Sequence, residues 1–443
     1  ISKTGEPYAR MGIGTGGFVL FCFTGFALGC LSGLTPGLHV NNLAFLLAGL
    51  AGAVSEFVAP SGLGLVMVTA AVTHTFLDII PSIVLGVPDE SMALVALPGH
   101  RMVLEGDGRE AVALSAAGSM LAVVFSFLVA VPVTLVMVRA YPMLSERMPL
   151  VLAGTVLYLV ATERGGEVGT HGGGGDTTWR DALIVRLKSL VVLGASGLLG
   201  YYVLTLGDDA GSALVGEPTL LMPLFVGLFG VPILAVSAFE NTEIPEQKPR
   251  AVSLQRRSVI VNAVGGGFAG SLVGWIPGVS PAVATSFVQS LLPDSEDEPA
   301  SMRAFIVGVS GVDTSNAVFA LLALYYIGLP RSGTMVALTR LEVDVSFEDV
   351  VAYLVGVAVV SVAAFAVTVA VGKYAFGAVR HVDYRVLSIG VVVMLVVLTF
   401  VFSGFVGLPI LVASTVVGLV PNYTRVRRVN CMGALLLPLI ILL

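Results

Sequence analysis

Two breaks rich in glycine and proline interrupt the apolar sequence, and both recur at matching positions in the second half of the chain. The stretch GFALGCLSGLTPG, which begins at Gly25, returns as GGFAGSLVGWIPG from Gly266, an offset of 241 residues. The motif LGVP at 85–88 returns as IGLP at 327–330, an offset of 242 residues. Paired breaks at corresponding positions of two halves are typical of membrane proteins built from repeats. The repetition therefore predicts two repeats, each with a helix broken within the membrane.

The apolar content indicates the broad class of fold. Of 443 residues, 56% are hydrophobic and 12% are charged, with a mean hydropathy of +0.95, whereas a soluble domain carries roughly 25% charged residues. Apolar runs of about 18 residues or more recur along the chain, and each is long enough to cross a bilayer as a helix. We predict an all-α polytopic protein that crosses the cell membrane many times. The three cysteines lack metal-site or redox spacing, so we expect no metal and no bound cofactor.

Hydropathy divides each half of the chain into seven apolar segments. The expected spans are 12–34, 38–59, 62–86, 111–138, 149–162, 182–206, 218–239, 258–276, 279–292, 303–329, 348–372, 385–402, 404–420 and 428–443. Two further segments, 89–104 and 331–342, are too short to span and are expected to be re-entrant, which requires protein or water around their backbone. The Gly-rich stretch 163–181 is expected to be a flexible connector.

Loop charges predict how the halves are oriented. The polar linker between them contains Lys248, Arg250 and Arg256, which the positive-inside rule assigns to the cytoplasm. Loop 101–110 contains two arginines and its repeat counterpart contains none, as expected if the second half is inverted. We predict a first transmembrane repeat, a cytoplasmic linker and an inverted second repeat. Their respective ranges are 1–240, 241–257 and 258–443. The net charge of −6 is consistent with a salt-adapted protein, and we expect no nucleic-acid partner.

The first duplicated break is expected to line a binding site. A helix that ends within the membrane exposes N–H groups of the next helix, and their positive dipole end favours an anion. The alternative is a proline kink that neighbouring groups repair. The candidate substrate-binding residues at the two copies are Pro36, Gly37, His39 and Asn41, and Pro277, Gly278 and Ser280. The glycines at four-residue spacing that precede both copies are better explained by close helix packing.

The second duplicated break is followed by polar groups in both halves. Such groups between apolar spans are costly in lipid, so a functional role is the default expectation. Arg331 is always charged and binds carboxylates or phosphates with two parallel hydrogen bonds. The alternative is that both segments are loops at the membrane surface. The candidate substrate-binding residues here are Pro88, Asp89 and Ser91, and Arg331 and Ser332.

Polar residues also occur inside two apolar spans at matching positions. The motif GVDTSNA at 311–317 corresponds to TAAVTHT at 69–75. An acid within a span needs a partner, so Asp313 is expected to couple to Na⁺ or H⁺, while His74 and Asp78, four residues apart, are suited to relay protons. The alternatives are interhelical hydrogen bonding and a satisfied structural pair. The candidate ion-coupling residues are Asp313, Thr314, Ser315, His74 and Asp78, with Asn316 assigned to the substrate.

These features together resemble a known family. The duplicated Pro-Gly breaks, the stretch PGHRMVLEGDGREAVALSAAGS and the stretch GVDTSNAVFALLALYYIGLPRSGTMVAL are similar to the large permease subunit (TctA) of tripartite tricarboxylate transporters, in its archaeal branch. The resemblance implies cation-coupled import of carboxylates such as citrate, usually with a small membrane subunit and a periplasmic binding protein. The chain departs from the family in GVDTSNA, where a Glu followed by Ala-Asn-Asn is more usual, and in LPRS, where IPGS is common.

Two other functions are weighed against carboxylate transport. A related permease group with similar Pro-Gly hairpins moves polyprenyl phosphates across membranes, so translocation of a lipid phosphate is the alternative within transport. An intramembrane enzyme would have to use His74, Asp78, Asp89 and Glu90, but no protease or phosphatase signature accompanies them. The chain also lacks the phosphate-binding loop of ATP-driven proteins. We therefore predict a secondary transporter with alternating access and no enzymatic activity.

Overall fold

The computed structural model describes residues 14–36, 40–54, 58–84, 96–163, 179–207, 210, 212–214, 218, 220–239, 245–248, 252–276, 281, 284, 298–341, 345–379, 384–424 and 426–442. All elements of regular secondary structure among these residues are helices. In chain order the elements are α1 (Thr15–Leu34), α2 (Val40–Val54), α3 (Pro60–Leu77), α4 (Ile79–Val84), α5 (Ala96–Leu104), α6 (Gly108–Ser145), α7 (Met148–Ala161), α8 (Trp179–Leu206), α9 (Leu221–Phe225), the π-helix η2 (Val226–Gly230), α10 (Val231–Phe239), α11 (Arg256–Val273), α13 (Glu298–Ile327), α14 (Gly333–Thr339), α15 (Phe347–Val379), α16 (Tyr384–Thr424), the 3-10 helix η3 (Arg428–Met432) and α17 (Gly433–Leu442).

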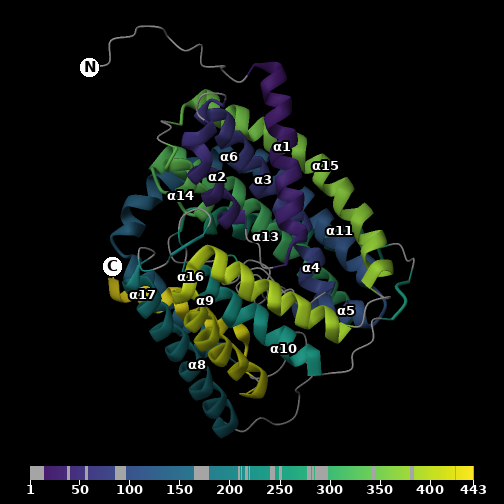
Figure 1. The fold of residues 1–443 in the computed structure, drawn as a ribbon, viewed down its shortest axis with the longest axis vertical. Helices are drawn as coiled ribbons and strands as arrows, with labels where there is room; N and C mark the ends of the chain where they lie inside the picture. The colour runs from purple at the N-terminus through teal and green to yellow at the C-terminus, as the bar shows by residue number, and fades with distance from the viewer. Residues whose placement is uncertain are drawn as a thin grey trace.

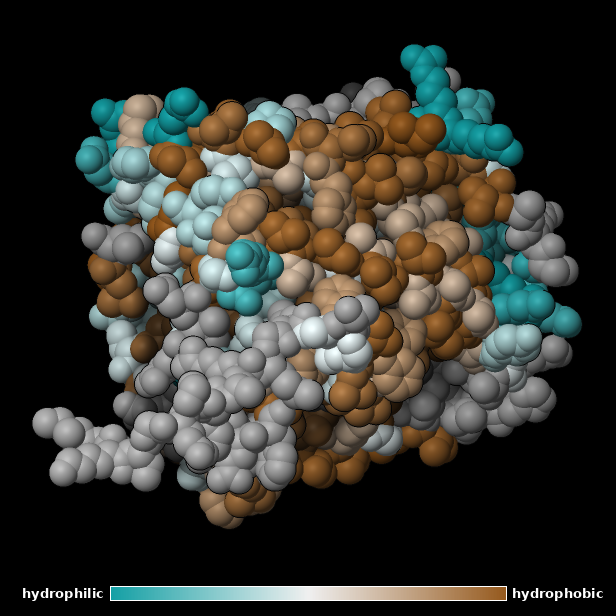
Figure 2. All heavy atoms as spheres, turned by 90° about the horizontal axis from the view of Figure 1, so that it is seen from above, coloured by the Kyte–Doolittle hydropathy of each residue, from teal (hydrophilic) through white to brown (hydrophobic). Residues whose placement is uncertain are grey.

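The lengths and apolar character of these helices make the protein a multi-pass membrane protein, which confirms the predicted fold class. Among the described residues, seven helices are long and apolar enough to cross a membrane. The most apolar window of α3 and α4 together is 100% buried and that of α13 is 89% buried, whereas the other five windows are between 28% and 33% buried. Figure 2 shows the resulting apolar surface across one face of the molecule. Thus α3 and α13 form the centre, and the other five candidate spans present most of their apolar side chains outward.

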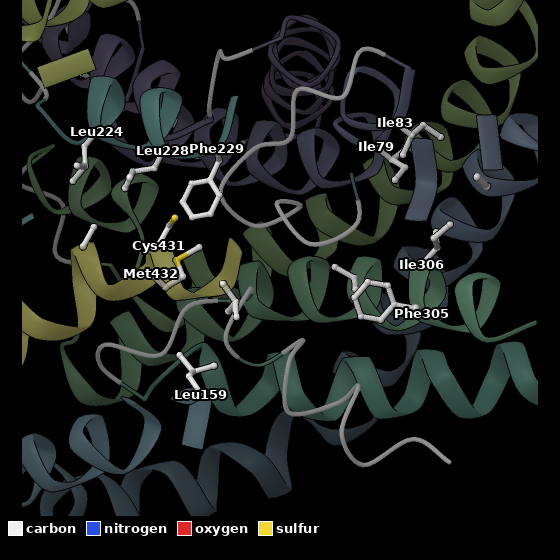
Figure 3. Close-up of a cluster of buried hydrophobic side chains, with 14 of the residues drawn as sticks. Ile79, Ile83, Leu159, Leu224, Leu228, Phe229, Phe305, Ile306, Cys431 and Met432 are labelled. Atoms are coloured by element: carbon white, nitrogen blue, oxygen red, sulfur yellow. The ribbon is translucent and has the colours of Figure 1, made fainter. Parts of the chain in front are cut away.

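The helices pack into two bundles, and each half of the chain contributes to both. Helices α1 to α6 pack with α11, α13, α14 and α15, whereas α7 to α10 pack with α16 and α17. Figure 1 shows α8, α10, α16 and α17 gathered on one side of the molecule. One buried apolar cluster joins the bundles, and Figure 3 shows Leu224, Phe229 and Met432 of the second bundle on one side of it and Ile79 and Phe305 of the first on the other. The linker therefore separates two halves of the sequence but not two packing units, and the assignment of repeats stays a prediction.

One expected span forms a helix too short to cross the membrane, and two others lie in a single element, α16. The segment expected to cross at 38–59 contains α2, whose 15 residues reach only about 22 Å at 1.5 Å per residue. The segments 385–402 and 404–420 belong to α16, in which Gly404 has φ 65° and ψ −157°. A Cβ on Gly407 would lie 3.1 Å from Cγ2 of Thr399, although residues eight apart in a straight helix are about 12 Å apart. The chain therefore folds back at Gly404, as two separate spans require.

The central helices α3 and α13 run in opposite directions. Hydrogen bonds join an earlier residue of α6 to an earlier residue of α13 and a later residue of α6 to a later residue of α13. The same holds for α3 and α15. The two helices of each pair are therefore parallel. These bonds join Ser115 with Ser310, Ser126 with Ser315, Ser61 with Tyr353, and Phe76 with Thr368. Helices α6 and α15 are antiparallel, because a Cβ on Gly108 would meet Phe376 and one on Gly372 would meet Val112. It follows that α3 is antiparallel to α13.

The linker between the halves is bound to the first bundle. Gln247 accepts a hydrogen bond from the N–H of Gly108 at 2.7 Å and donates to the carbonyl of Val103 at 2.9 Å. The N–H and hydroxyl of Ser253 both donate to Oε1 of Glu110, at 2.6 and 2.7 Å. The described part of the linker is therefore fixed to the turn between α5 and α6.

Buried ion pairs lie beneath this linker. Arg303, near the start of α13, lies 2.9 Å from Asp107 and 3.0 Å from Glu110. Lys248 of the linker is 3.6 Å from the other oxygen of Asp107. Arg303, Asp107 and Glu110 are all nearly buried, so removal of one of them would leave a costly unpaired charge. The cluster joins both halves of the chain at the linker end.

One residue of the expected flexible connector 163–181 is rigidly held. The side chain of Glu163 is buried, and it accepts hydrogen bonds from Asn430 at 2.7 Å and from Arg427 at 3.3 Å. At the other end of the connector, Trp179 already belongs to α8. The prediction was therefore wrong at these two ends, because a buried polar network and a helix start occupy them. The intervening residues 164–178 lie outside the described part of the chain.

Candidate functional site

The duplicated glycines place α1 and α11 in close contact with the two central helices. A Cβ on Gly25 would lie 2.6 Å from the carbonyl oxygen of Val66, and one on Gly266 would lie 2.0 Å from that of Gly308. Real side chains would not fit at these distances, so close helix packing, the preferred explanation for these glycines, is confirmed. The contacts recur along both pairs: Gly29 with Ala70, Gly33 with Leu77, Gly270 with Val312, and Gly274 with Phe319. Each contacted residue of α13 is 242 positions beyond its counterpart in α3.

Both first breaks end a helix where the sequence predicted. Helix α1 ends at Leu34, and the N–H and hydroxyl of Thr35 both donate to the carbonyl of Leu31, at 3.1 and 2.7 Å. Pro36 follows in a turn, and α2 begins at Val40. Proline has no N–H and cannot continue the intrahelical bonding, which explains the end of α1. In the second half, α11 ends at Val273, four residues before the corresponding proline.

The first break of one half contacts the second break of the other half. Oδ1 of Asn41, at the start of α2, accepts hydrogen bonds from the N–H of Thr334 at 3.0 Å and from its hydroxyl at 3.2 Å. A Cβ on Gly333 would lie 2.6 Å from the side-chain carbon Cγ of Asn41, so only glycine allows this approach. The N-termini of α2 and α14 therefore meet at Asn41.

The segment that contains Arg331 also reaches the other copy of the first break. A guanidinium N–H of Arg331 donates to the carbonyl oxygen of Ile276, the residue just before Pro277. Ser332 caps α14, because its hydroxyl accepts from the N–H of Met335 at 3.2 Å. The four residues from Arg331 to Thr334 thus contact the flanks of both Pro-Gly breaks. Predicted site residues from both halves meet at this segment.

Hydroxyl groups form the polar centre of the first bundle. The hydroxyls of Thr75 and Thr314 are 3.0 Å apart at the crossing of α3 and α13. Ser315 donates to the carbonyl of Gly267 at 2.7 Å and accepts from Ser126 at 3.0 Å. These contacts are the interhelical bonds that we considered as the structural alternative for Thr314 and Ser315. An ion-coupling role for the two residues stays a prediction.

The predicted titratable groups lie in the same buried region. Asp78 follows the last residue of α3 and is 2% exposed, and Asp313 of α13 is 5% exposed. Nδ1 of His74 is 3.0 Å from the hydroxyl of Ser32 on α1, and Asn316 is partly buried. Among the described residues, no group of three or more His, Cys, Asp or Glu side chains is arranged to hold a metal ion. A proton or Na⁺ role for these residues stays a prediction.

Eight predicted site residues cannot be placed in this geometry. They lie outside the described residues, and they are Gly37, His39, Pro88, Asp89, Ser91, Pro277, Gly278 and Ser280.

Sequence reasoning missed several residues that the structure places at the site. Ser32 binds His74, and Ser126 binds Ser315. A signal for one group was present, since Ser115, Ser119 and Ser126 are spaced for a single helix face. No sequence signal indicated that Thr334 and Asn41, 293 positions apart, would be partners.

Comparison with known proteins assigns this chain to a family. The Tripartite tricarboxylate transporter TctA family matches residues 19–433. The chain belongs to this family. It is also 27% identical to the uncharacterised protein MJ1079 of Methanocaldococcus jannaschii over 434 residues, which are 96% of this chain and 98% of that protein. No solved structure matches the chain. The predicted resemblance is confirmed, and the archaeal relative is consistent with the predicted branch of the TctA family.

Proposed function

We propose that this TctA protein is a secondary active transporter that moves a di- or tricarboxylate across the cell membrane together with Na⁺ or H⁺. The observation that carries the proposal is the contact of segment 331–334 with both broken regions, through Asn41 and Ile276. Broken helices that meet inside an apolar bundle are the usual construction of substrate sites in secondary transporters. Membership of a transporter family supports the same class and gives no support to an enzyme.

An inverted repeat accounts for this arrangement. The support is the opposite direction of α3 and α13, and the recurrence of the same glycine contacts at an offset of 242. In such a protein the two halves exchange roles when the site opens to the other side of the membrane. The first bundle, which contains the site, would then move against the second bundle, as alternating access requires.

The anion would be held by donors from both halves. Arg331 would supply the fixed charge, and the start of α2 at Asn41 would supply the positive end of a helix dipole. Gly37, Gly278 and Ser280, which lie outside the described residues, would add backbone and side-chain donors. Asp313 would bind the coupling cation next to the Thr75–Thr314 contact. The family comparison does not support the lipid-phosphate alternative.

Uptake by purified protein in sealed vesicles tests the proposal. Labelled citrate should accumulate when a Na⁺ or proton gradient is imposed, and an unlabelled di- or tricarboxylate should compete with it. A small membrane subunit and a periplasmic binding protein are proposed partners, so the assay is run with and without the candidate subunits. Failure of every di- and tricarboxylate to accumulate or compete in both forms would contradict the proposal.

A further inference from the structure

Trp275, two residues before the Pro-Gly break of the second half, is buried with a hydrogen-bond donor that is unsatisfied among the described residues and that its packing does not explain. Trp275 is 4% exposed and belongs to a buried apolar cluster that includes Met137, Phe319 and Val350. Its indole Nε1–H has no hydrogen-bond acceptor among the residues that the structure describes. A buried indole N–H usually has an acceptor, because removal of the group from water is otherwise unfavourable. An indole in this apolar cluster therefore costs stability that a phenylalanine ring would not.

The backbone of Trp275 lies next to a residue of the proposed substrate site. The residue that follows it, Ile276, is the one whose carbonyl oxygen binds Arg331. Tyr141 packs against the same apolar cluster as Trp275 and lies within electrostatic range of Arg331. The residue that carries the indole and the residue that binds Arg331 are thus neighbours in the short stretch just after α11.

The first half of the chain shows that the fold does not need an indole here. The residue at the corresponding position, 241 earlier, is Leu34, which is partly buried and packs against the same kind of apolar cluster. An aliphatic side chain therefore suffices to end the broken helix in that half. The additional feature of the second half is one hydrogen-bond donor.

We propose that the indole N–H of Trp275 donates to the bound carboxylate anion beside Arg331, and that Trp275 is a specificity-determining residue of the transport site. This inference rests on the proposed function, since it takes a carboxylate as the ligand. It accounts for a buried donor that has no acceptor among the described residues, because the bound anion supplies the acceptor. A hydrogen bond from a neutral donor to a charged acceptor is stronger than one between neutral groups, so the donor favours anions over neutral solutes.

Two variants of the full chain separate this role from packing. The chain has only two tryptophans, and Trp179 is 72% exposed at the start of α8, so Trp179→Phe is the matched control. Trp275→Phe keeps an aromatic ring and removes the donor. Citrate affinity and the thermal midpoint without citrate are measured for the wild type and both variants. We expect Trp275→Phe to weaken citrate binding about tenfold while its midpoint is unchanged or higher, and we expect Trp179→Phe to behave as the wild type.

The control variant also provides a spectroscopic readout. In Trp179→Phe the fluorescence comes from Trp275 alone, and it should shift with citrate and saturate at the concentration that saturates binding. The inference is overturned if Trp275→Phe binds citrate as tightly as the wild type, or if the Trp275 emission does not respond at saturation. If the wild type binds no citrate or other di- or tricarboxylate, the proposed function fails, and the donor role fails with it.

Discussion

Oδ1 of Asn41 lies 3.0 Å from the backbone N of Thr334, a hydrogen bond that joins residues 293 positions apart in the chain. It ties the start of α2 in the first half to the start of α14 in the second. We expect Asn41→Asp to keep this bond, since a carboxylate oxygen also accepts from the N–H, and to place a negative charge at the site. Carboxylate affinity should fall at least tenfold while the thermal midpoint stays near that of the wild type. Asn41→Ala, which loses the bond itself, should lower the midpoint.

Arg331 is expected to be essential for anion binding. Arg331→Ala removes the guanidinium that binds the carbonyl of Ile276, and with it the fixed positive charge of the site. Citrate binding by calorimetry should be abolished, while Arg331→Lys should retain weak binding because lysine keeps the charge without the planar fork. Arg340→Ala is the matched control, since Arg340 is exposed just after α14. Wild-type affinity in Arg331→Ala would show that the site lies elsewhere.

Asp313 is expected to couple transport to the cation. Asp313→Asn preserves the shape of this buried side chain, which is 5% exposed, and removes its charge. Uptake of labelled citrate into vesicles should lose its dependence on the Na⁺ or proton gradient, whereas exchange of citrate for citrate should survive. The same experiment on Asp78→Asn serves as the comparison. A gradient dependence that persists in Asp313→Asn and disappears in Asp78→Asn would transfer the coupling role to Asp78.

Because α11 lies so close to α13, we expect alanine substitutions at two glycines of α11 to have very different effects on stability. A Cβ on Gly270 would lie 2.2 Å from the carbonyl oxygen of Val312, whereas one on Gly265 would meet nothing within 4 Å. Gly270→Ala should destabilise the protein by about 2 kcal/mol through overpacking. Gly265→Ala should be neutral or stabilising by about 0.5 kcal/mol, because alanine favours the helix. Thermal midpoints in detergent check both values, and equal midpoints would contradict the packing.

The sequence predicted the parts of the fold that depend on local patterns. Apolar runs give the helices, and proline at position 36 explains why α1 ends at Leu34. The glycine spacing predicted close packing but not the partner helix, which depends on contacts between distant segments. The same limit applies to the pairing of Asn41 with Thr334, and to Arg303 with Asp107 and Glu110. The binding role of Gly37 and Gly278 stays a prediction, since both lie outside the described residues.

A density map of the protein with citrate bound tests the central claim most directly. The account predicts density for one anion in the first bundle, between the start of α2 at Asn41 and the guanidinium of Arg331. Density for citrate in the second bundle, or at the membrane surface away from both Pro-Gly breaks, would contradict it.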